Sequence, residues 1–562
     1  LSRLTDSADN FVDYRYDKVG RLSFVDRNNL NGAAMEFDSA GRIVNRQYPG
    51  GVQANYAYYD DDRIQKIEYV SGLANMLAES RYNYDPQGRV SQLIETINGS
   101  AVTKEYLYDN LSRLTREREN LAGGAFSDTM YEYDEFGNRT KIVYPDGTEL
   151  NYEYGSDNKL TLVRDESLQV VGKYQYDSRG RLIRSCDGES AADITSVTLD
   201  ECAIREYRFY QYDKFNQLTR VDWYGYLGGE VLLRSDLFST SLPLGVSQFQ
   251  NTYSYDARRN RKSVVEIQTT DYKTAQENTV VLKQESFIYE NGNVYKDSDQ
   301  FWVYSNGIDK PLYSVDSFGA VTNYHQNAQN SVILTTNGND GSIVATQRFD
   351  AYGNKQYSTG VIKRLGFTGR EVDSSGLLYY RARYYDPTKG RFLTQDPLGF
   401  VDGINRYAYV RNNPVNYVDP FGTASISSTL SSAIDDYFDS NALFSNNTGG
   451  ISLSYNDNYP LGELIDFGLE LESPVINQFS IAQQGNWRLQ LASNGEVGGA
   501  VFDAAKDKIV GKAFENLSSD QINTLREMYG RATNAQCNTF GWKRLVHRMG
   551  ECRTTRFETI IG

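Results

Sequence analysis

Two copies of an Asp-Pro-x-Gly element stand close together in the second half of the sequence. They read Asp396-Pro397-Leu398-Gly399 and Asp419-Pro420-Phe421-Gly422. Aspartate, proline and glycine at these positions suit tight turns, and turn geometry alone would account for them. Two aspartates that come close together cannot easily both ionise, so one can hold and donate a proton while the other activates water. The chemistry that such a pair could carry is acid–base hydrolysis.

A second group of chemically capable side chains lies near the C-terminus. If residues 541–552 form a helix, Lys543, His547 and Glu551 share one face at four-residue spacing. A histidine base, a cation for phosphate and a carboxylate suit metal-free RNA cleavage. The alternative is a solvated amphipathic helix held by i,i+4 ion pairs. The sequence has only two histidines, which argues against a histidine-based zinc site, and it predicts no metal site and no cofactor.

Charge and cysteine content narrow the function classes further. Residues 529–562 carry six basic and two acidic side chains, which suits either a nucleic-acid or nucleotide contact or a solvated face. The net charge of −15 argues against the whole chain coating nucleic acid. Four cysteines are too few for a disulfide framework; for Cys186 and Cys202, a local disulfide and two free buried thiols both stay open.

Both Asp-Pro-x-Gly elements lie within Leu365–Gly422, which we name the terminator. Tyrosines alternate there with turn dipeptides, a pattern that predicts compact β-structure rather than a linker. After Gly422 the pattern stops, and residues 518–532 further on are predicted to form a helix. We therefore expect three parts: a β-hairpin array over 1–364, the terminator over 365–422 and a small α+β domain over 423–562.

A Tyr-x-Tyr-Asp unit recurs through the array, often followed by a turn, Gly-Arg and an apolar residue. Clear copies are Tyr14–Leu22, Tyr82–Val90 and Tyr174–Leu182. Tyrosines two apart share one face of a strand, the aspartate opens a turn, and the glycine supplies a positive φ. One hairpin cannot bury its own face, so neighbours must stack into a continuous sheet and the fold class is mainly β. The opening Leu1–Thr5 recurs within a repeat as Leu111–Thr115, so we expect a fragment of a longer protein.

The array and its ending resemble the Rhs/YD-repeat proteins and their associated core domain. The resemblance rests on the Tyr-x-Tyr-Asp units, on the run Gly376–Pro387 (GLLYYRARYYDP) and on Gly390-Arg391-Phe392, and it covers roughly residues 1–422. It implies that the YD-repeat hairpins spiral into a hollow β-shell with the core domain plugging one end. It also implies that the chain's own C-terminal domain, a toxin, is the cargo of that shell.

The same resemblance implies that aspartates of the terminator cut the chain just past the second Asp-Pro-x-Gly element. Carried over by motif, the pair is Asp396 and Asp419, with Asp402 in reserve and Arg391 as a supporting charge partner. An intramolecular substrate suits a weak catalyst, because the scissile bond is held at high effective concentration. Thr423 stands where the family usually has leucine, and the cut is expected beside it.

The resemblance therefore predicts a bacterial polymorphic toxin that is secreted or injected, with type VI secretion as a route and interbacterial competition as its use. It implies a cognate immunity protein and an upstream secretion-apparatus component as partners. Nuclease activity is favoured, so nucleic acid is the expected target, while nucleotide transferase and membrane activities stay open. No apolar run reaches membrane-spanning length. The alternative class is a non-catalytic surface adhesin or carbohydrate-binding protein, which tyrosine-rich strands would also allow.

Overall fold

The chain divides into two units, which are described separately. The first consists of Leu1–Gln395 with Ile404–Tyr437, and the second of Asp396–Gly403 with Phe438–Gly562. The computed structural model describes residues 3–5, 11–28, 32–121, 124–187, 206–226, 246–270, 277–290, 292–305, 307–400, 402–427, 451–454, 478–481 and 487–491. Over these ranges all regular structure is β-strand except four three-residue turns, and no helix could span a membrane. The prediction of a mainly β fold is confirmed.

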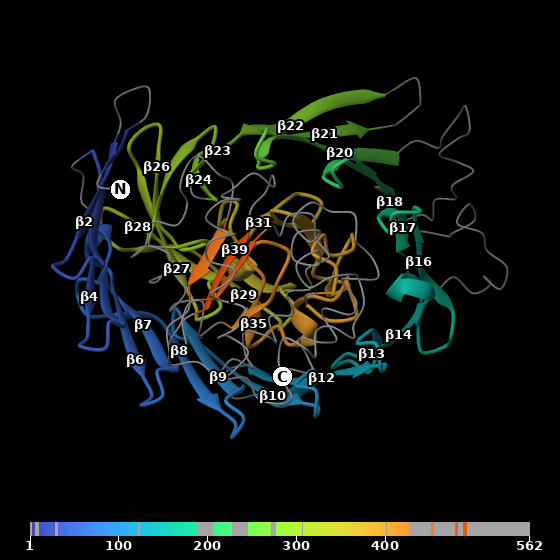
Figure 1. Ribbon diagram of the computed structural model, residues 1–562, viewed down its shortest axis with the longest axis horizontal. Helices are drawn as coiled ribbons and strands as arrows, with labels where there is room; N and C mark the ends of the chain where they lie inside the picture. The colour runs from blue at the N-terminus through green and yellow to red at the C-terminus, as the bar shows by residue number, and fades with distance from the viewer. Residues whose placement is uncertain are drawn as a thin grey trace, which may run out of the picture. The chain divides into compact units, whose positions relative to one another are not determined.

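A 22-stranded sheet makes up most of the first unit. Every strand pairs antiparallel with the strands before and after it in the sequence, as stacked hairpins must. Figure 1 shows these strands following one another along a curve, from blue through teal to green. The strands are β1 (Arg3–Thr5), β2 (Phe11–Tyr16), β3 (Leu22–Arg27), β4 (Ala33–Phe37), β5 (Ile43–Gln47), β6 (Gln53–Tyr58), β7 (Ile64–Val70), β8 (Met76–Tyr84), β9 (Val90–Ile97), β10 (Ser100–Tyr108), β11 (Leu114–Leu121), β12 (Phe126–Tyr133), β13 (Arg139–Val143), β14 (Glu149–Tyr154), β15 (Leu160–Arg164), β16 (Val170–Tyr176), β17 (Leu182–Asp187), β18 (Glu206–Tyr212), β19 (Leu218–Tyr226), β20 (Val246–Tyr255), β21 (Arg261–Thr270) and β22 (Asn278–Ser286).

The turn between β8 and β9 shows how one repeat closes. The Oδ1 atom of Asp85 accepts backbone N–H bonds from Gln87 and Arg89, both at 2.9 Å, and its Oδ2 accepts from Arg89 Nε at 2.7 Å. Gly88 takes the positive φ of 82° that this turn requires. Burial would raise the pKa of the Asp85 carboxyl, but the bonds from the Arg89 side chain and backbone outweigh burial and lower it. The same bonds recur at Asp17/Arg21, Asp38/Arg42, Asp109/Arg113 and Asp177/Arg181.

The repeat arginine also binds the next hairpin. Arg89 Nη1 donates to the backbone carbonyl of Asp109 at 3.3 Å, and its guanidinium lies 4.7 Å from the ring centroid of Tyr108. In return, the Tyr108 hydroxyl donates to the backbone carbonyl of Val90 at 2.7 Å. The pattern repeats one hairpin further on, where Arg113 donates to Asp134 O at 2.6 Å. At these two junctions, a hydrogen bond in each direction and a cation–π contact tie one hairpin to the next.

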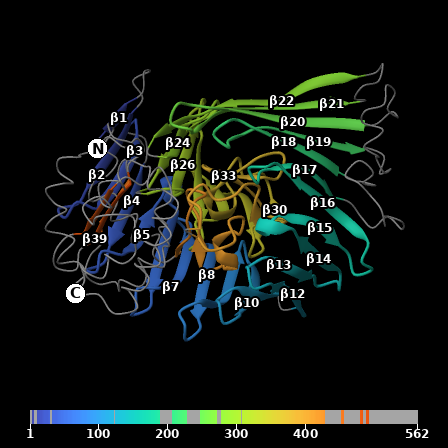
Figure 2. The ribbon, with the colours of Figure 1, turned by 45° about the vertical axis from the view of Figure 1, so that its right-hand side comes forward.

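A second sheet of eight strands continues the chain and packs against the first. Its strands are β23 (Ile288–Glu290), β24 (Asn293–Lys296), β25 (Gln300–Tyr304), β26 (Pro311–Asp316), β27 (Val321–Gln326), β28 (Val332–Asn337), β29 (Ile343–Phe349) and β30 (Lys355–Thr359). Figures 1 and 2 show this sheet on the inner side of the curve of the large sheet. Buried tyrosines of the array such as Tyr82 and Tyr106 share one apolar core with Trp302 and Tyr324 of the inner sheet. The core thus forms between the two sheets.

The terminator lies on the same inner side and forms small sheets and turns. Its strands are β31 (Glu371–Val372), β32 (Leu378–Tyr380), β33 (Arg383–Asp386), β34 (Arg391–Phe392) and β35 (Tyr417–Val418), the last of which pairs with β36 (Ile426–Ser427). The four short turns of the unit are η1 (Pro49–Gly51), η2 (Ser156–Asn158), η3 (Phe367–Gly369) and η4 (Val410–Asn412). A buried cluster that includes Tyr380, Tyr385 and Tyr409 holds the terminator together. Compact β-structure was the prediction for this stretch, and it is confirmed.

The terminator is hydrogen-bonded to separate hairpins of the array. Asn416 accepts from Val90 N at 2.8 Å through its Oδ1. Tyr407 OH donates to Gly180 O at 2.7 Å. Asn412 Nδ2 donates to the backbone carbonyl of Gly137 at 2.7 Å. These bonds span the array, so the position of the terminator depends on several hairpins at once.

In the second unit, the described residues after the terminator are three antiparallel strands, ordered β37 (Ile451–Ser454), β39 (Trp487–Leu491) and β38 (Gln478–Ile481). The helices predicted over 518–532 and 541–552 lie outside the described residues.

Candidate functional site

The β32–β33 turn, Arg381–Arg383, donates hydrogen bonds to three consecutive carbonyl groups of the second Asp-Pro-x-Gly element. Arg381 Nη1 donates to the carbonyl of Pro420, and Ala382 N donates to Phe421 O at 3.1 Å. Arg383 Nε donates to Gly422 O at 2.5 Å. Successive residues of the turn thus donate to successive residues of the element. These bonds fix the backbone of residues 420–422 at each carbonyl group.

Asp419 lies at the centre of this arrangement and is fully buried. Its Oδ1 accepts from the backbone N–H of Thr423 at 2.9 Å and of Ala424 at 3.1 Å. Its Oδ2 pairs with Arg383 Nη2 at 3.2 Å. The two peptide bonds that flank Thr423 therefore both direct their N–H groups to one buried carboxylate. A carboxyl group in this place can exchange a proton with either nitrogen.

Arg383 supplies the positive charge of the site. Its side chain is also buried; Nη1 donates to Arg406 O at 3.0 Å, and the guanidinium lies 3.6 Å from the ring centroid of Phe392. A fixed guanidinium on the Gly422 carbonyl stabilises negative charge on that oxygen, as an oxyanion-binding group does. Arg383 was not among the residues predicted from the sequence, whereas Arg391 was. The signal that could have indicated Arg383 is its position in the Arg381-Ala382-Arg383 run of the terminator.

Glycine is the only residue type that fits at position 422. Its φ is +69°, and a Cβ there would lie 2.2 Å from the carbonyl oxygen of Tyr380 and 3.1 Å from Arg383 N. Both neighbours are backbone atoms, which cannot rotate away. The glycine lets the segment before Thr423 lie directly against the β32–β33 turn.

The remaining sequence-predicted residues lie as follows. Asp396 belongs to the second unit; it is nearly buried, and its Oδ1 accepts from Leu398 N at 2.8 Å in the expected turn. Asp402 belongs to the same unit and is also largely buried. Arg391 Nη2 donates to Asn158 O at 2.7 Å, in the array. The pairing of Asp396 with Asp419 stays a prediction, as does the supporting role of Arg391. Lys543, His547 and Glu551 lie outside the described residues.

Cys186 is disulfide-bonded, so free thiols were the wrong alternative for this residue. Its predicted partner Cys202 lies outside the described residues.

The backbone of turn η4, which precedes the second Asp-Pro-x-Gly element in the sequence, is strained. Val410, Arg411 and Asn412 have φ values of 41°, 54° and 60°, a left-handed conformation that is a rare exception for a β-branched residue. Such strain persists only where the surroundings enforce it, and it gathers at functional sites. Here the Asn412 bond to Gly137 and the burial of Val410 supply that enforcement.

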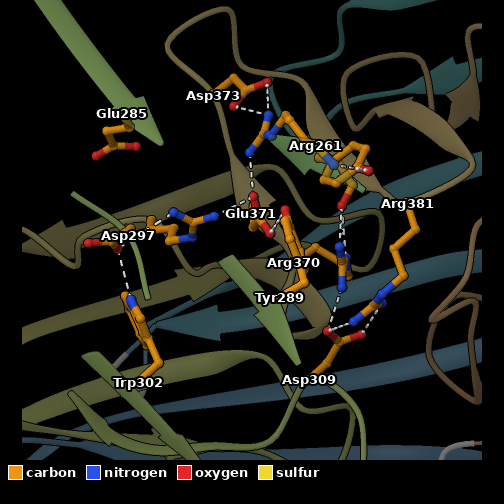
Figure 3. A network of polar contacts seen from close by, with 12 residues as sticks. Arg261, Glu285, Tyr289, Asp297, Trp302, Asp309, Arg370, Glu371, Asp373 and Arg381 are labelled. Carbon is orange, nitrogen blue, oxygen red and sulfur yellow. Dashed lines mark hydrogen bonds and ion pairs between the residues drawn. The ribbon is translucent and has the colours of Figure 1, made fainter. Parts of the chain in front are cut away.

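Buried ion pairs join the terminator to the array and the inner sheet (Figure 3). Arg261 of β21 pairs with Asp373 at 2.7 Å and also with Glu371. Arg364 pairs with Glu371 at 2.7 Å. Burial would raise the pKa of the Glu371 carboxyl, but Arg364 and Arg261 outweigh burial and lower it to about 2. Glu371 is therefore ionised at neutral pH, and the network stays charged.

This architecture defines a class of protein: an array of tyrosine–aspartate hairpins followed by a compact tyrosine-rich terminator that is hydrogen-bonded to it. Residues 57–227 match the family model described as Teneurin YD-shell. The repeats and the terminator of this chain are similar to those of the Rhs/YD-repeat proteins.

Known relatives match much of the chain but extend well beyond it. "Toxin subunit YenC1" of Yersinia entomophaga is 24% identical over 467 residues, covering 75% of this chain and 46% of that protein. "tRNA3(Ser)-specific nuclease WapA" of Bacillus spizizenii is 31% identical over 305 residues, covering 52% of this chain and 11% of that protein. The crystal structure of "TcdB2-TccC3-TEV" has a TM-score of 0.48 at 19% identity, over 75% of this chain and 21% of that one. The chain spans less than half the length of both curated relatives.

Proposed function

We propose that the chain is part of a Rhs-type polymorphic toxin whose terminator cuts the chain beside Thr423. Residues 1–364 form the shell, residues 365–422 the core domain that cuts, and residues 423–562 the effector that is released. The observation that carries the proposal is that the Asp419 carboxylate accepts hydrogen bonds from the backbone N–H groups of Thr423 and Ala424. The hydrogen bond from Arg383 to the Gly422 carbonyl supports it further.

The reaction is hydrolysis of a peptide bond flanking Thr423. The oxygen of a water molecule forms a bond to the carbonyl carbon and the C–N bond breaks; water loses one proton to a base, and the leaving amine gains one proton from an acid. Asp419, next to both amide nitrogens, is the group that passes a proton to the amine. Asp396 is the base that takes the proton from water, on the strength of the paired motif, and Arg383 stabilises negative charge on the Gly422 oxygen.

The effector is proposed to act on nucleic acid in a target cell. The support is that one relative is named a toxin subunit and another a tRNA-specific nuclease, although each is much longer than this chain. Delivery is by secretion or injection, with an immunity protein protecting the producer. Neither name favours the adhesin alternative.

Intact-mass analysis of the purified full-length chain tests the cleavage. Two polypeptides that separate beside Thr423 are expected for the wild type, and one intact chain for Asp419→Asn and Asp396→Asn. Each variant should retain the thermal transition of the wild type. A wild-type chain of full mass would refute the proposal.

Growth of bacteria that express residues 424–562 tests the effector separately. We expect arrested growth, relieved by His547→Ala if the Lys543–His547–Glu551 face is catalytic. Normal growth with soluble, folded protein present would refute the toxin role while leaving the cleavage result intact.

A further inference from the structure

Arg381 contacts the segment that precedes Thr423, and the proposed chemistry does not require this contact. Its Nη1 donates to the carbonyl of Pro420, two residues before the Gly422 carbonyl. Within the described part of the chain, its guanidinium bonds to Gly292, Asp309 and Pro420, and not to Asp419 or to either peptide bond that flanks Thr423. Whatever Arg381 contributes to cleavage, it contributes through the position of the chain.

Two groups of the inner sheet hold the Arg381 guanidinium, and Figure 3 shows one of them, Asp309. Asp309, in the loop between β25 and β26, accepts from Nη2 at 2.8 Å and from Nη1 at 3.0 Å. The carbonyl of Gly292, between β23 and β24, accepts from Nη2 at 2.8 Å and from Nε at 3.1 Å. This two-pronged pairing with a carboxylate fixes the plane of a guanidinium, which a lysine ammonium could not reproduce.

Asp309 is itself immobilised. It is largely buried and pairs with a second arginine, Arg370, through Oδ1, and its backbone N–H donates to Asn293 Oδ1 at 2.9 Å. Arg370 in turn donates to Tyr379 O at 2.9 Å, at the start of the β32–β33 turn. The inner sheet thus holds both the side chain of Arg381 and the backbone that precedes it.

The backbone of Arg381 is also unusual. Its φ is +53°, a left-handed value at a non-glycine residue. This conformation is what allows Arg381, Ala382 and Arg383 to present consecutive donors to the carbonyls of 420–422. The ion pair with Asp309 and the bonds to Gly292 hold the side chain that anchors this turn.

We propose that Arg381, held by Asp309 of the inner sheet, is a positioning residue that sets which peptide bond lies against Asp419 and Arg383. This inference rests on the proposed self-cleavage. Without the outermost of the three donors, the segment before Thr423 can slide along the turn. Both N–H groups beside Thr423 already share one carboxylate, so a small slide changes which bond is cut. A misplacement of about 1 Å is enough to slow a positioned reaction about 100-fold.

Cell-free synthesis of the full chain, followed over time by gel and intact mass, tests the proposal. For Arg381→Met we expect cleavage about 100-fold slower, with fragment masses from more than one cut position. Arg381→Lys keeps the positive charge but not the planar, forked guanidinium. Its cleavage rate should lie between those of the wild type and Arg381→Met. Asp309→Asn should reproduce the mixed cuts. The double variant should be no slower than Arg381→Met, because both changes remove one interaction.

Arg348→Met is the matched control. Arg348 is also a largely buried inner-sheet arginine; it pairs with Glu95 at 3.5 Å and donates to Ser100, and none of its described bonds reaches the terminator. It should cleave at the wild-type rate and position although its melting temperature falls. Arg381→Met cutting as fast as Arg348→Met, and at the same single bond, would overturn the proposal. A wild-type chain that stays intact would instead refute self-cleavage itself.

Discussion

Replacing Gly422 with alanine should stop or strongly slow self-cleavage while leaving the fold in place. The added Cβ would lie 2.2 Å from Tyr380 O, whereas ordinary contacts begin near 3.4 Å. Relieving that overlap moves the segment by about 1 Å, which can cost about 100-fold in the rate of a positioned reaction. A left-handed alanine adds about 1–2 kcal/mol of backbone strain. The rate should therefore fall much more than the stability.

Gly376→Ala separates the two effects. Gly376 lies in the same terminator with φ +78°, so alanine carries a similar backbone strain there, but nothing lies within 4 Å of the new Cβ. Both variants and the wild type would be synthesised as full chains and followed by intact mass over time, with thermal unfolding measured in parallel. Gly376→Ala should cleave like the wild type. If Gly422→Ala cleaves as fast as Gly376→Ala, the close approach of the β32–β33 turn does not position the reaction.

Three further outcomes follow from the described contacts. Arg383→Met should slow cleavage about 100-fold or more, since it removes the donor on the Gly422 carbonyl, and unchanged intact-mass kinetics would exclude that role. Glu371, with its pKa lowered from 4.5 to about 2, stabilises the fold fully above pH 4.5 and loses that contribution, about 3 kcal/mol, as pH falls towards 2. Melting temperatures of the wild type and Glu371→Gln should therefore converge below pH 4.5; a constant gap contradicts this. Arg113→Met should lower the unfolding free energy by about 2 kcal/mol by breaking the bond to Asp134 O and the stack on Tyr133, which denaturant midpoints can check.

The hairpin turns could be predicted from the sequence because their bonds are local. Asp85, Gly88 and Arg89 lie within five positions, and aspartate, glycine and arginine each have one role in a turn of that length. The bonds between hairpins could not be predicted in the same way. The contact of Arg89 with Tyr108 depends on which strand follows and in which register, and residue types alone do not specify register.

Arg383, the arginine proposed to act in cleavage, was missed for the same reason. Arg391 was predicted instead, as a supporting charge partner of the aspartate pair. Arg383 reaches Asp419 because the start of β33 and a turn 36 positions later lie side by side, and such a pairing leaves no periodic trace in the sequence. Asp419 itself was predicted through its motif, and the structure adds the two amide groups that it binds.

The reciprocal bonds between neighbouring hairpins bear on how such arrays change over evolutionary time. Arg89 and Arg113 each need only a turn carbonyl and a tyrosine from the next hairpin. Duplication or loss of a whole hairpin that offers both groups would therefore leave a junction of the same kind. What restricts such changes is the terminator, whose bonds to Val90, Gly137 and Gly180 require those hairpins at set distances along the curve. The number of hairpins can therefore change without consequence for the terminator only in parts of the array that the terminator does not contact.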